Sequence, residues 1–311
     1  MIDEEKIVEE KIGQPVCVAP TGDACGEGAV WHAAHEAVYW TDINRFLIHR
    51  FTPSDFCVRT WFFDEPVTAL TLTDRTEVLA VVLSSSAILW EPQTDVRHDP
   101  IFHLDGWPKV RLNDARADPR GSLWLGSMRN NVNSDGSACA IGGQDGALFR
   151  LDPDGKCKIW RRDLGIANTL AWSPDHRRFY FGDSLANIVW VHDYDPATGA
   201  ISNERPFFQG FARGFPDGST VDSEGYLWNC RFLGGCVVRV APDGKIDRVV
   251  EMPAKNVTTC TFGGVDLKTL YVTTARLEAP AADRLAGGLY AIQMEVAGQP
   301  ENCFRIFGLT R

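Results

Sequence analysis

Six polar residues recur at one point of a repeating unit, and four of them have side chains that could bind a metal ion or a sugar. Each lies eleven or twelve residues before the hydrophobic residue that marks a strand; the pairs are Glu27 and Tyr39, Thr68 and Leu79, Asn113 and Trp124, Asn168 and Tyr180, Asp217 and Trp228, and Thr259 and Tyr271. In a radially symmetric fold, equivalent positions of successive repeats converge on one axis. Two carboxylates and two amides from distant parts of the chain are therefore expected to meet.

Glu27, Asn168 and Asp217 could supply three oxygen ligands from three repeats. Hard cations such as Ca²⁺, Mg²⁺ and Mn²⁺ prefer carboxylate, amide and water oxygens. Three protein ligands would leave positions open for water and substrate, as a catalytic metal requires. Each residue also has a structural interpretation, Asn168 and Asp217 as turn residues and Glu27 as a solvated side chain. Their shared position in the repeat favours the metal site.

Arg111 and Asn113 lie two positions apart at the equivalent edge of the third repeat. Alternation along an extended segment places both side chains on one face. There a guanidinium and an amide could bind the hydroxyl and carbonyl oxygens of a small polar ligand. The alternative is a surface ion pair between Arg111 and Asp114, which would contribute little to stability.

The elements that must position these residues are short strands joined by turns. The marker strands follow turn-like stretches, as at residues 118–121 and 222–225, where Asp, Pro and Gly supply the dihedral angles and hydrogen bonds of tight turns. A second apolar motif follows each marker strand, so each unit is expected to hold about four strands. No stretch has a convincing period near 3.6 residues, and almost no helix is expected.

Six such units, spaced roughly 40 to 55 residues apart, predict an all-β fold, a six-bladed β-propeller with a central metal-binding channel. An open solenoid is the competing arrangement, and the propeller is favoured because closure protects the sheet edges. A single domain is expected for residues 1–311, with the propeller proper at about 16–308. The long third interval predicts a loop at residues 129–146 over one channel mouth, either a lid or an ordinary surface insertion.

The composition is that of a soluble globular protein, with 44% hydrophobic residues, 23% charged residues and a formal net charge of −10. Nucleic acids and anionic membranes bind basic surfaces, so neither is expected as a partner. Residues 1–14 are charged and lack the apolar segment of a signal peptide. The nine cysteines show no Cys-x-x-Cys spacing, which predicts free thiols and a cytoplasmic protein. The oligomeric state stays open, and a monomer fits these observations.

The chain resembles the family of senescence marker protein 30 (regucalcin) and the bacterial gluconolactonases and pentonolactonases. The resemblance extends from about Gly26 to about Val296, and as an ordered set its motifs are specific. The matching segments are residues 26–31 (GEGAVW), 111–114 (RLND), 118–121 (DPRG), 126–128 (GSM), 172–175 (WSPD), 216–219 (PDGS), 221–228 (VDSEGYLW), 262–264 (FGG) and 271–276 (YVTTAR).

The resemblance implies a six-bladed propeller whose functional residues match positions of this chain. It implies one divalent metal ion bound by Glu27, Asn168 and Asp217, and a sugar lactone contacted by Arg111 and Asn113. Alignment through residues 127–128 suggests Asn131 where regucalcin has a substrate-binding glutamate. Two further departures are Thr169 and Ala115, which replace glycines usual in the family.

The leading hypothesis is metal-dependent hydrolysis of an aldonic acid lactone to the free sugar acid, with Asp217 as a metal ligand and as the base. The expected cofactor is one divalent metal ion, Ca²⁺, Mg²⁺, Mn²⁺ or Zn²⁺, with Fe²⁺ as a further option, and the expected partner is a small-molecule sugar lactone. Two alternatives stay open. One is a metal hydrolase of the phosphotriesterase or arylesterase type, and the other is a non-catalytic calcium-binding propeller.

Overall fold

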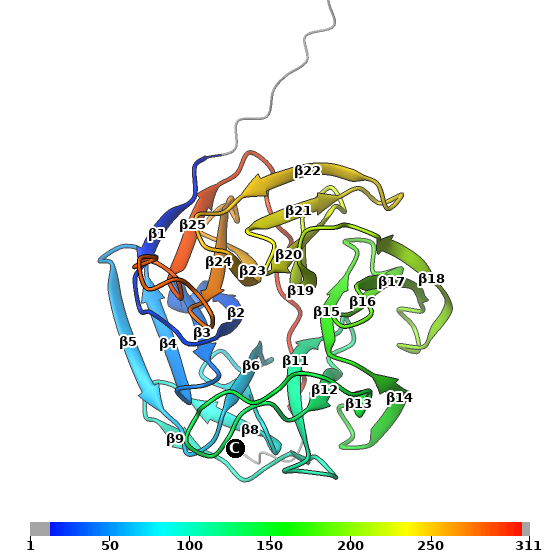
Figure 1. The fold of residues 1–311 in the computed structure, drawn as a ribbon. Helices are drawn as coiled ribbons and strands as arrows, with labels where there is room; N and C mark the ends of the chain where they lie inside the picture. The colour runs from blue at the N-terminus through cyan, green and yellow to red at the C-terminus, as the bar shows by residue number, and fades with distance from the viewer. Residues whose placement is uncertain (1–12, 307–311) are drawn as a thin grey trace, which may run out of the picture.

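Six antiparallel sheets surround a central axis in the computed structural model, which describes residues 13–306 (Figure 1). The innermost strand of each sheet is its first in sequence, except in the sixth sheet, whose outermost strand comes from the N-terminal end of the described chain. The six innermost strands lie beside one another around the axis. The all-β, six-bladed propeller predicted from the repeat is therefore confirmed. Residues 307 and 308, placed in the propeller by the sequence analysis, lie outside the described residues.

The strands have the following bounds. Blade one contains β2 (Gly26–His32), β3 (Ala37–Asp42), β4 (Leu47–Thr52) and β5 (Cys57–Phe62). Blade two contains β6 (Val67–Leu72), β7 (Leu79–Leu83), β8 (Ser86–Glu91), β9 (Val96–Arg97) and β10 (Phe102–His103). Blade three contains β11 (Val110–Ala117), β12 (Leu123–Arg129), β13 (Gly146–Leu151) and β14 (Cys157–Leu164).

Blade four contains β15 (Ala167–Trp172), β16 (Arg178–Asp183), β17 (Ile188–Tyr194) and β18 (Ile201–Gln209). Blade five contains β19 (Phe215–Val221), β20 (Leu227–Phe232), β21 (Cys236–Val240) and β22 (Ile246–Glu251). Blade six contains β23 (Asn256–Gly263), β24 (Thr269–Ala275), β25 (Leu289–Gln293) and β1 (Val16–Ala19). The described residues contain one helix, a single 3₁₀ turn at Ala33–His35, in line with the expected near-absence of helix.

The ring closes because the first and last strands of the described chain share a sheet. β1 pairs antiparallel with β25 and so supplies the outermost strand of blade six. The blade therefore combines both ends of the chain, and the ring is held by backbone hydrogen bonds. Repetition of the blades around the ring leaves only short, protected sheet edges.

The hydrophobic core is divided into six clusters, one between each pair of neighbouring blades. The six marker residues lie on the second strands and are all buried; they are Tyr39, Leu79, Trp124, Tyr180, Trp228 and Tyr271. Their recurrence in the sequence thus has a packing cause. Each fills the space where one sheet stacks on the next.

An aspartate at the start of a turn fixes the second strand in several blades. Asp222 accepts hydrogen bonds from the backbone N–H groups of Glu224 and Tyr226 at 3.0 Å, and its other oxygen accepts from Trp228 Nε1 at 2.9 Å. Asp118 makes the equivalent contact with Trp124 Nε1 at 3.0 Å. These turn residues are structural and point away from the chemistry expected at the axis.

The long third interval contains the predicted loop, since β12 ends at Arg129 and β13 begins at Gly146. The loop extends toward blade one, where Asn44 Nδ2 donates a hydrogen bond of 2.8 Å to Gly136 O. It also contributes Asn131 and Ile141 to the lining of the axial cavity described below. Its predicted position at a channel mouth is confirmed, while a lid motion stays a prediction.

All nine cysteines lie in the described part of the chain and are free thiols. Four of them are exposed, and the prediction of free thiols is confirmed. Within residues 13–306, no helix has the length and apolar character needed to cross a membrane.

Candidate functional site

A β-bulge in every innermost strand places the recurring polar residues at the axis. In blade four, Asn168 pairs with Gly182 and Ala171 pairs with Tyr180, so β15 has one more residue than β16 over this stretch. The register shifts at the equivalent place in β2, β6, β11, β19 and β23. A bulge re-aims a side chain and adds twist, which explains why one position in each repeat carries the candidate chemistry.

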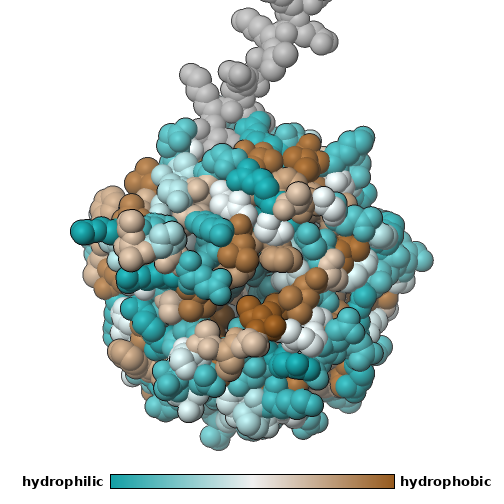
Figure 2. Space-filling view, viewed as in Figure 1, coloured by the Kyte–Doolittle hydropathy of each residue, from teal (hydrophilic) through white to brown (hydrophobic). Residues whose placement is uncertain are grey.

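All six predicted site residues line one cavity at the end of the propeller where the innermost strands begin. The cavity has a volume of about 340 Å³, and its predicted residues are Glu27, Arg111, Asn113, Asn131, Asn168 and Asp217. It opens near the middle of the face shown in Figure 2, where hydrophobic side chains surround a hollow. The two threonines of the repeat do not line it. Thr68 is buried and bonded to Val82 O, and Thr259 packs against Gly218.

A chain of hydrogen bonds joins the polar residues across three blades. Arg111 donates through a terminal nitrogen to Asn113 Oδ1 at 2.7 Å, and Asn113 Nδ2 donates to Asn168 Oδ1 at 3.0 Å. Asn168 Nδ2 in turn donates to Asp217 Oδ1 at 2.8 Å. Arg111 Nε donates to Asn131 Oδ1 at 2.9 Å. The alternative surface pair between Arg111 and Asp114 is not formed, since Arg111 is only 4% exposed and bonds to these amides.

The two site carboxyl groups are held in a poorly solvated environment. Burial and the charge of Asp114 raise the pKa of Glu27 to about 8. Burial and the nearby Glu27 raise the pKa of Asp217 well above its usual range. Burial lowers the pKa of Arg111 to about 10, against the opposing effect of these acidic groups. Two buried carboxyl groups that lie close together are stabilised either when one of them keeps its proton or when a cation binds between them.

The donor set fits one hard divalent cation. Two carboxylates and an amide converge from β2, β15 and β19, and a cation would offset the burial and the nearby negative charge that raise both carboxyl pKa values. Residues 13–306 contain no group of three or more His, Cys, Asp or Glu side chains that could hold a metal. The proposed set has only two such residues, so its third protein ligand would have to be an amide.

Two further residues of the site were missed by the sequence analysis. Ser184 accepts a hydrogen bond from Asn168 Nδ2 at 2.8 Å and donates to Pro216 O at 2.6 Å, tying blade four to blade five. Cys25 lines the cavity, and burial together with Glu27 raises the pKa of its thiol. Ser184 lies in the β16–β17 turn, and no repeat in the sequence marks it.

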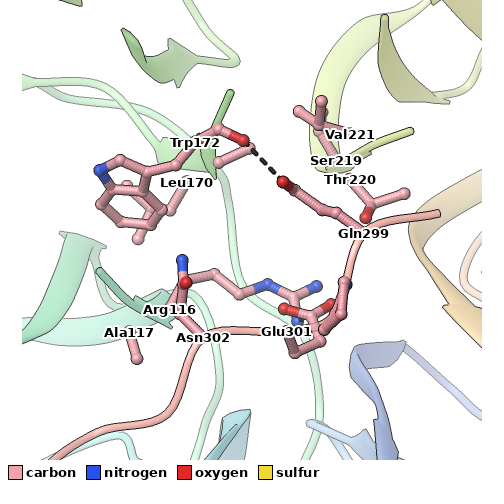
Figure 3. Close-up of a pocket in the computed structure, with 12 residues that line it drawn as sticks. Arg116, Ala117, Leu170, Trp172, Ser219, Thr220, Val221, Gln299, Glu301 and Asn302 are labelled. Carbon is pink, nitrogen blue, oxygen red and sulfur yellow. Dashed lines mark hydrogen bonds and ion pairs between the residues drawn. The ribbon is translucent and has the colours of Figure 1, made fainter. Parts of the chain in front are cut away.

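The opposite end of the channel is covered by the C-terminal segment (Figure 3). Gln299 Nε2 donates a hydrogen bond of 2.7 Å to Trp172 O, and Glu301 forms an ion pair with Arg116 at 3.2 Å. The small cavity there has a volume of only about 20 Å³, about the space for one water molecule. Ligand access is therefore expected from the face that carries the larger cavity.

Comparison with known proteins assigns the chain to a family. Residues 25–276 match the family described as SMP-30/Gluconolactonase/LRE-like region. The chain therefore belongs to this family of propeller proteins, as the resemblance predicted.

Individual relatives cover nearly the whole chain. A pentonolactonase of Haloferax volcanii is 32% identical over 297 residues, which cover 91% of this chain and 96% of the relative. Regucalcin of Oryctolagus cuniculus is 34% identical over 284 residues, with coverage of 89% and 93%. The crystal structure of a calcium-binding protein, regucalcin, from Agrobacterium tumefaciens superposes with a TM-score of 0.85 at 26% identity, covering 94% of this chain and 97% of that one.

Proposed function

We propose that this protein is a divalent-metal-dependent hydrolase of sugar lactones, converting an aldonic acid lactone to the free acid. The observation that carries the proposal is the convergence of Glu27, Asn168 and Asp217 in one cavity with the hydrogen-bonded pair Arg111 and Asn113. The family membership and the pentonolactonase among the relatives support the substrate class.

Glu27, Asn168 and Asp217 would hold one divalent cation. When bound, such a cation acts as a Lewis acid toward a carbonyl oxygen and lowers the pKa of a bound water. The carboxylate pair suits this role because each group would gain an opposite charge in a site where burial disfavours its ionised form. We expect cation binding to stabilise the fold by acting on the native state alone.

Asp217 would act as the base on the attacking water. The carboxylate accepts a proton as the water oxygen bonds to the lactone carbonyl carbon. The bond between that carbon and the ring oxygen then breaks, and the ring oxygen takes the proton to become a hydroxyl group. The product is the open-chain hydroxy acid, so atoms and charges balance.

Arg111 and the amides beside it would orient the lactone. Arg111 donates from Nε to Asn131 and from one terminal nitrogen to Asn113. Within the described residues, its other terminal nitrogen has no protein partner. That nitrogen can donate to a ring hydroxyl or carbonyl oxygen. Because the guanidinium is held at two points by amides, little side-chain entropy remains to be lost on binding.

The experiment is acid release from a panel of aldonolactones, with phenyl acetate and paraoxon as comparison substrates, with and without chelator. We expect aldonolactones to have the highest kcat/KM, chelation to abolish the rate, and Asp217→Ala to lower kcat by about 10²- to 10⁴-fold. Asp243→Ala, at an exposed turn, serves as the control. Faster turnover of the aryl ester or of paraoxon than of every lactone would contradict the proposal, and so would cation binding without any turnover.

A further inference from the structure

A ring of aliphatic side chains surrounds the mouth of the axial cavity. Five of the six blades each supply one such residue from the same loop, the connection between the second and third strands. We call this set the aliphatic collar; its members are Ile43, Ile141, Leu185, Leu233 and Leu277. Blade two is the exception, because β7 and β8 are joined by Ser84 and Ser85 alone.

Two members of the collar are exposed in a way that folding alone does not explain. Ile141 is 52% exposed and Leu185 is 42% exposed. Figure 2 shows the hydrophobic surface gathered around the central hollow of this face. A concentration of apolar groups at a concave site, rather than scattered over the surface, is typical of a ligand site.

Leu233 gives an independent indication that the collar has a function. Its φ angle is +62°, in the left-handed region, which costs a residue with a side chain roughly 1–2 kcal/mol. Leu233 begins a three-residue turn whose other two positions are glycines. A leucine occupies a position where glycine or asparagine would fit the backbone better, and such strain clusters at functional sites.

The floor of the cavity has the opposite character from the collar. The charged residues among its lining are Glu27, Arg111 and Asp217, and all three belong to the polar cluster at the ends of the innermost strands. The mouth is lined by the collar with Phe215 and Phe232. A ligand that fills the cavity must therefore be polar at one end and apolar at the other.

We infer that the aliphatic collar is a subsite for an alkyl group, and that the protein also hydrolyses γ-lactones with an alkyl substituent on the ring carbon bonded to the ring oxygen, faster than the unsubstituted ring. The inference rests on the proposed lactone hydrolysis at the polar floor. The lactone carbonyl meets the floor, and the substituent remains at the mouth against the collar. An alkyl substituent there would be removed from water against apolar side chains.

The expected size of the preference follows from the area that the collar can cover. Each methylene removed from water raises kcat/KM roughly three- to fourfold. Because the mouth stays partly open, about half of a butyl group would be covered, and γ-octalactone should exceed γ-butyrolactone by about tenfold in kcat/KM.

The test measures kcat/KM for γ-butyrolactone, γ-hexalactone and γ-octalactone, with D-xylono-1,4-lactone as the reference sugar lactone. We expect a rising series for the wild type and a flat one for Leu185→Asn and for Leu233→Asn, since asparagine tolerates the left-handed backbone of Leu233. Leu285→Asn is the matched control, because Leu285 is 45% exposed but lies outside the cavity lining. Thermal unfolding confirms that each variant is folded.

The outcomes separate the inference from the proposed function. A rising series that both collar variants flatten and Leu285→Asn preserves supports the inference. A flat wild-type series with turnover of xylonolactone overturns the inference and leaves the proposed function intact. A rising series that the collar variants do not change also overturns it, because another surface would then bind the alkyl group. Hydrolysis of neither class of lactone contradicts the proposed function, and the inference fails with it.

Discussion

Thr169 shows how one residue can join two blades at the site. It follows Asn168 in the bulge of β15 and has a φ angle of +57°, an unusual conformation for a β-branched residue. Glycine adopts this left-handed backbone without strain, and the corresponding residue after Glu27 is Gly28, with a φ angle of +58°. The Thr169 hydroxyl donates to Asp217 O at 2.6 Å and is 3.1 Å from Ser219 Oγ, so it helps to fix the position of Asp217.

For stability and activity, the hydroxyl group of Thr169 should therefore matter more than the shape of the side chain. We expect Thr169→Val to lower the free energy of unfolding by about 1–3 kcal/mol, because the buried Asp217 carbonyl loses its shorter hydrogen bond and keeps only the 3.4 Å bond from Asn229 Nδ2, and to lower kcat. Thr169→Ser keeps the hydroxyl and should resemble the wild type. Denaturant unfolding and lactone turnover measure both effects. Equal behaviour of the two variants would show that the hydrogen bond to Asp217 is unimportant.

Most polar residues of the site could be predicted from the repeat, Arg111 from its spacing to Asn113, and Asn131 from the family resemblance, whereas Ser184 could not. Glu27, Asn168 and Asp217 share a phase in the repeat, and that phase corresponds to a bulge at the axis. Ser184 belongs to a turn without such a pattern. The separation of Thr68 and Thr259 from the cavity depends on side-chain packing, which the repeat alone does not specify.

At the scale of elements, a buried turn carboxylate ties the strands of blade five together. Asp222 lies at the turn before β20 and pairs with Arg239 of β21 at 2.8 Å, with both side chains almost fully buried. The turn could be predicted from the sequence, because Asp and Gly favour defined positions of tight turns. It did not show the ion pair, because Arg239 reaches the turn only when β20 and β21 pair.

Asp222→Ala should destabilise the fold strongly. The substitution removes the hydrogen bonds of the turn and one buried acidic partner of the Arg239 guanidinium, which also pairs with Glu224 and Asp247. Loss of one member of a buried pair costs about 3–5 kcal/mol, measurable by denaturant unfolding. Asp243→Ala, at the exposed turn after β21, is the matched control. A loss of stability no larger than that of the control would contradict this role for Asp222.

At the scale of the whole molecule, closure makes one site from distant segments. Glu27 and Asp217 are separated by most of the propeller in sequence and meet because the six innermost strands surround one axis. The number of blades was predictable from the markers. The closing strand Val16–Ala19 was not, because its four residues carry no repeat signal and acquire their place by pairing with β25.

The measurement that tests the central claim most directly is reconstitution of the metal-free protein with Ca²⁺, Mg²⁺, Mn²⁺, Zn²⁺ and Fe²⁺ in turn, with lactone hydrolysis recorded at each addition. Glu27, Asn168 and Asp217 form one donor set per propeller, so with at least one of these cations the rate should rise in proportion to metal and level off at one ion per chain. Asp217→Asn should show neither activity nor tight metal binding. Full activity of the metal-free protein, or wild-type activity of Asp217→Asn, would contradict the account.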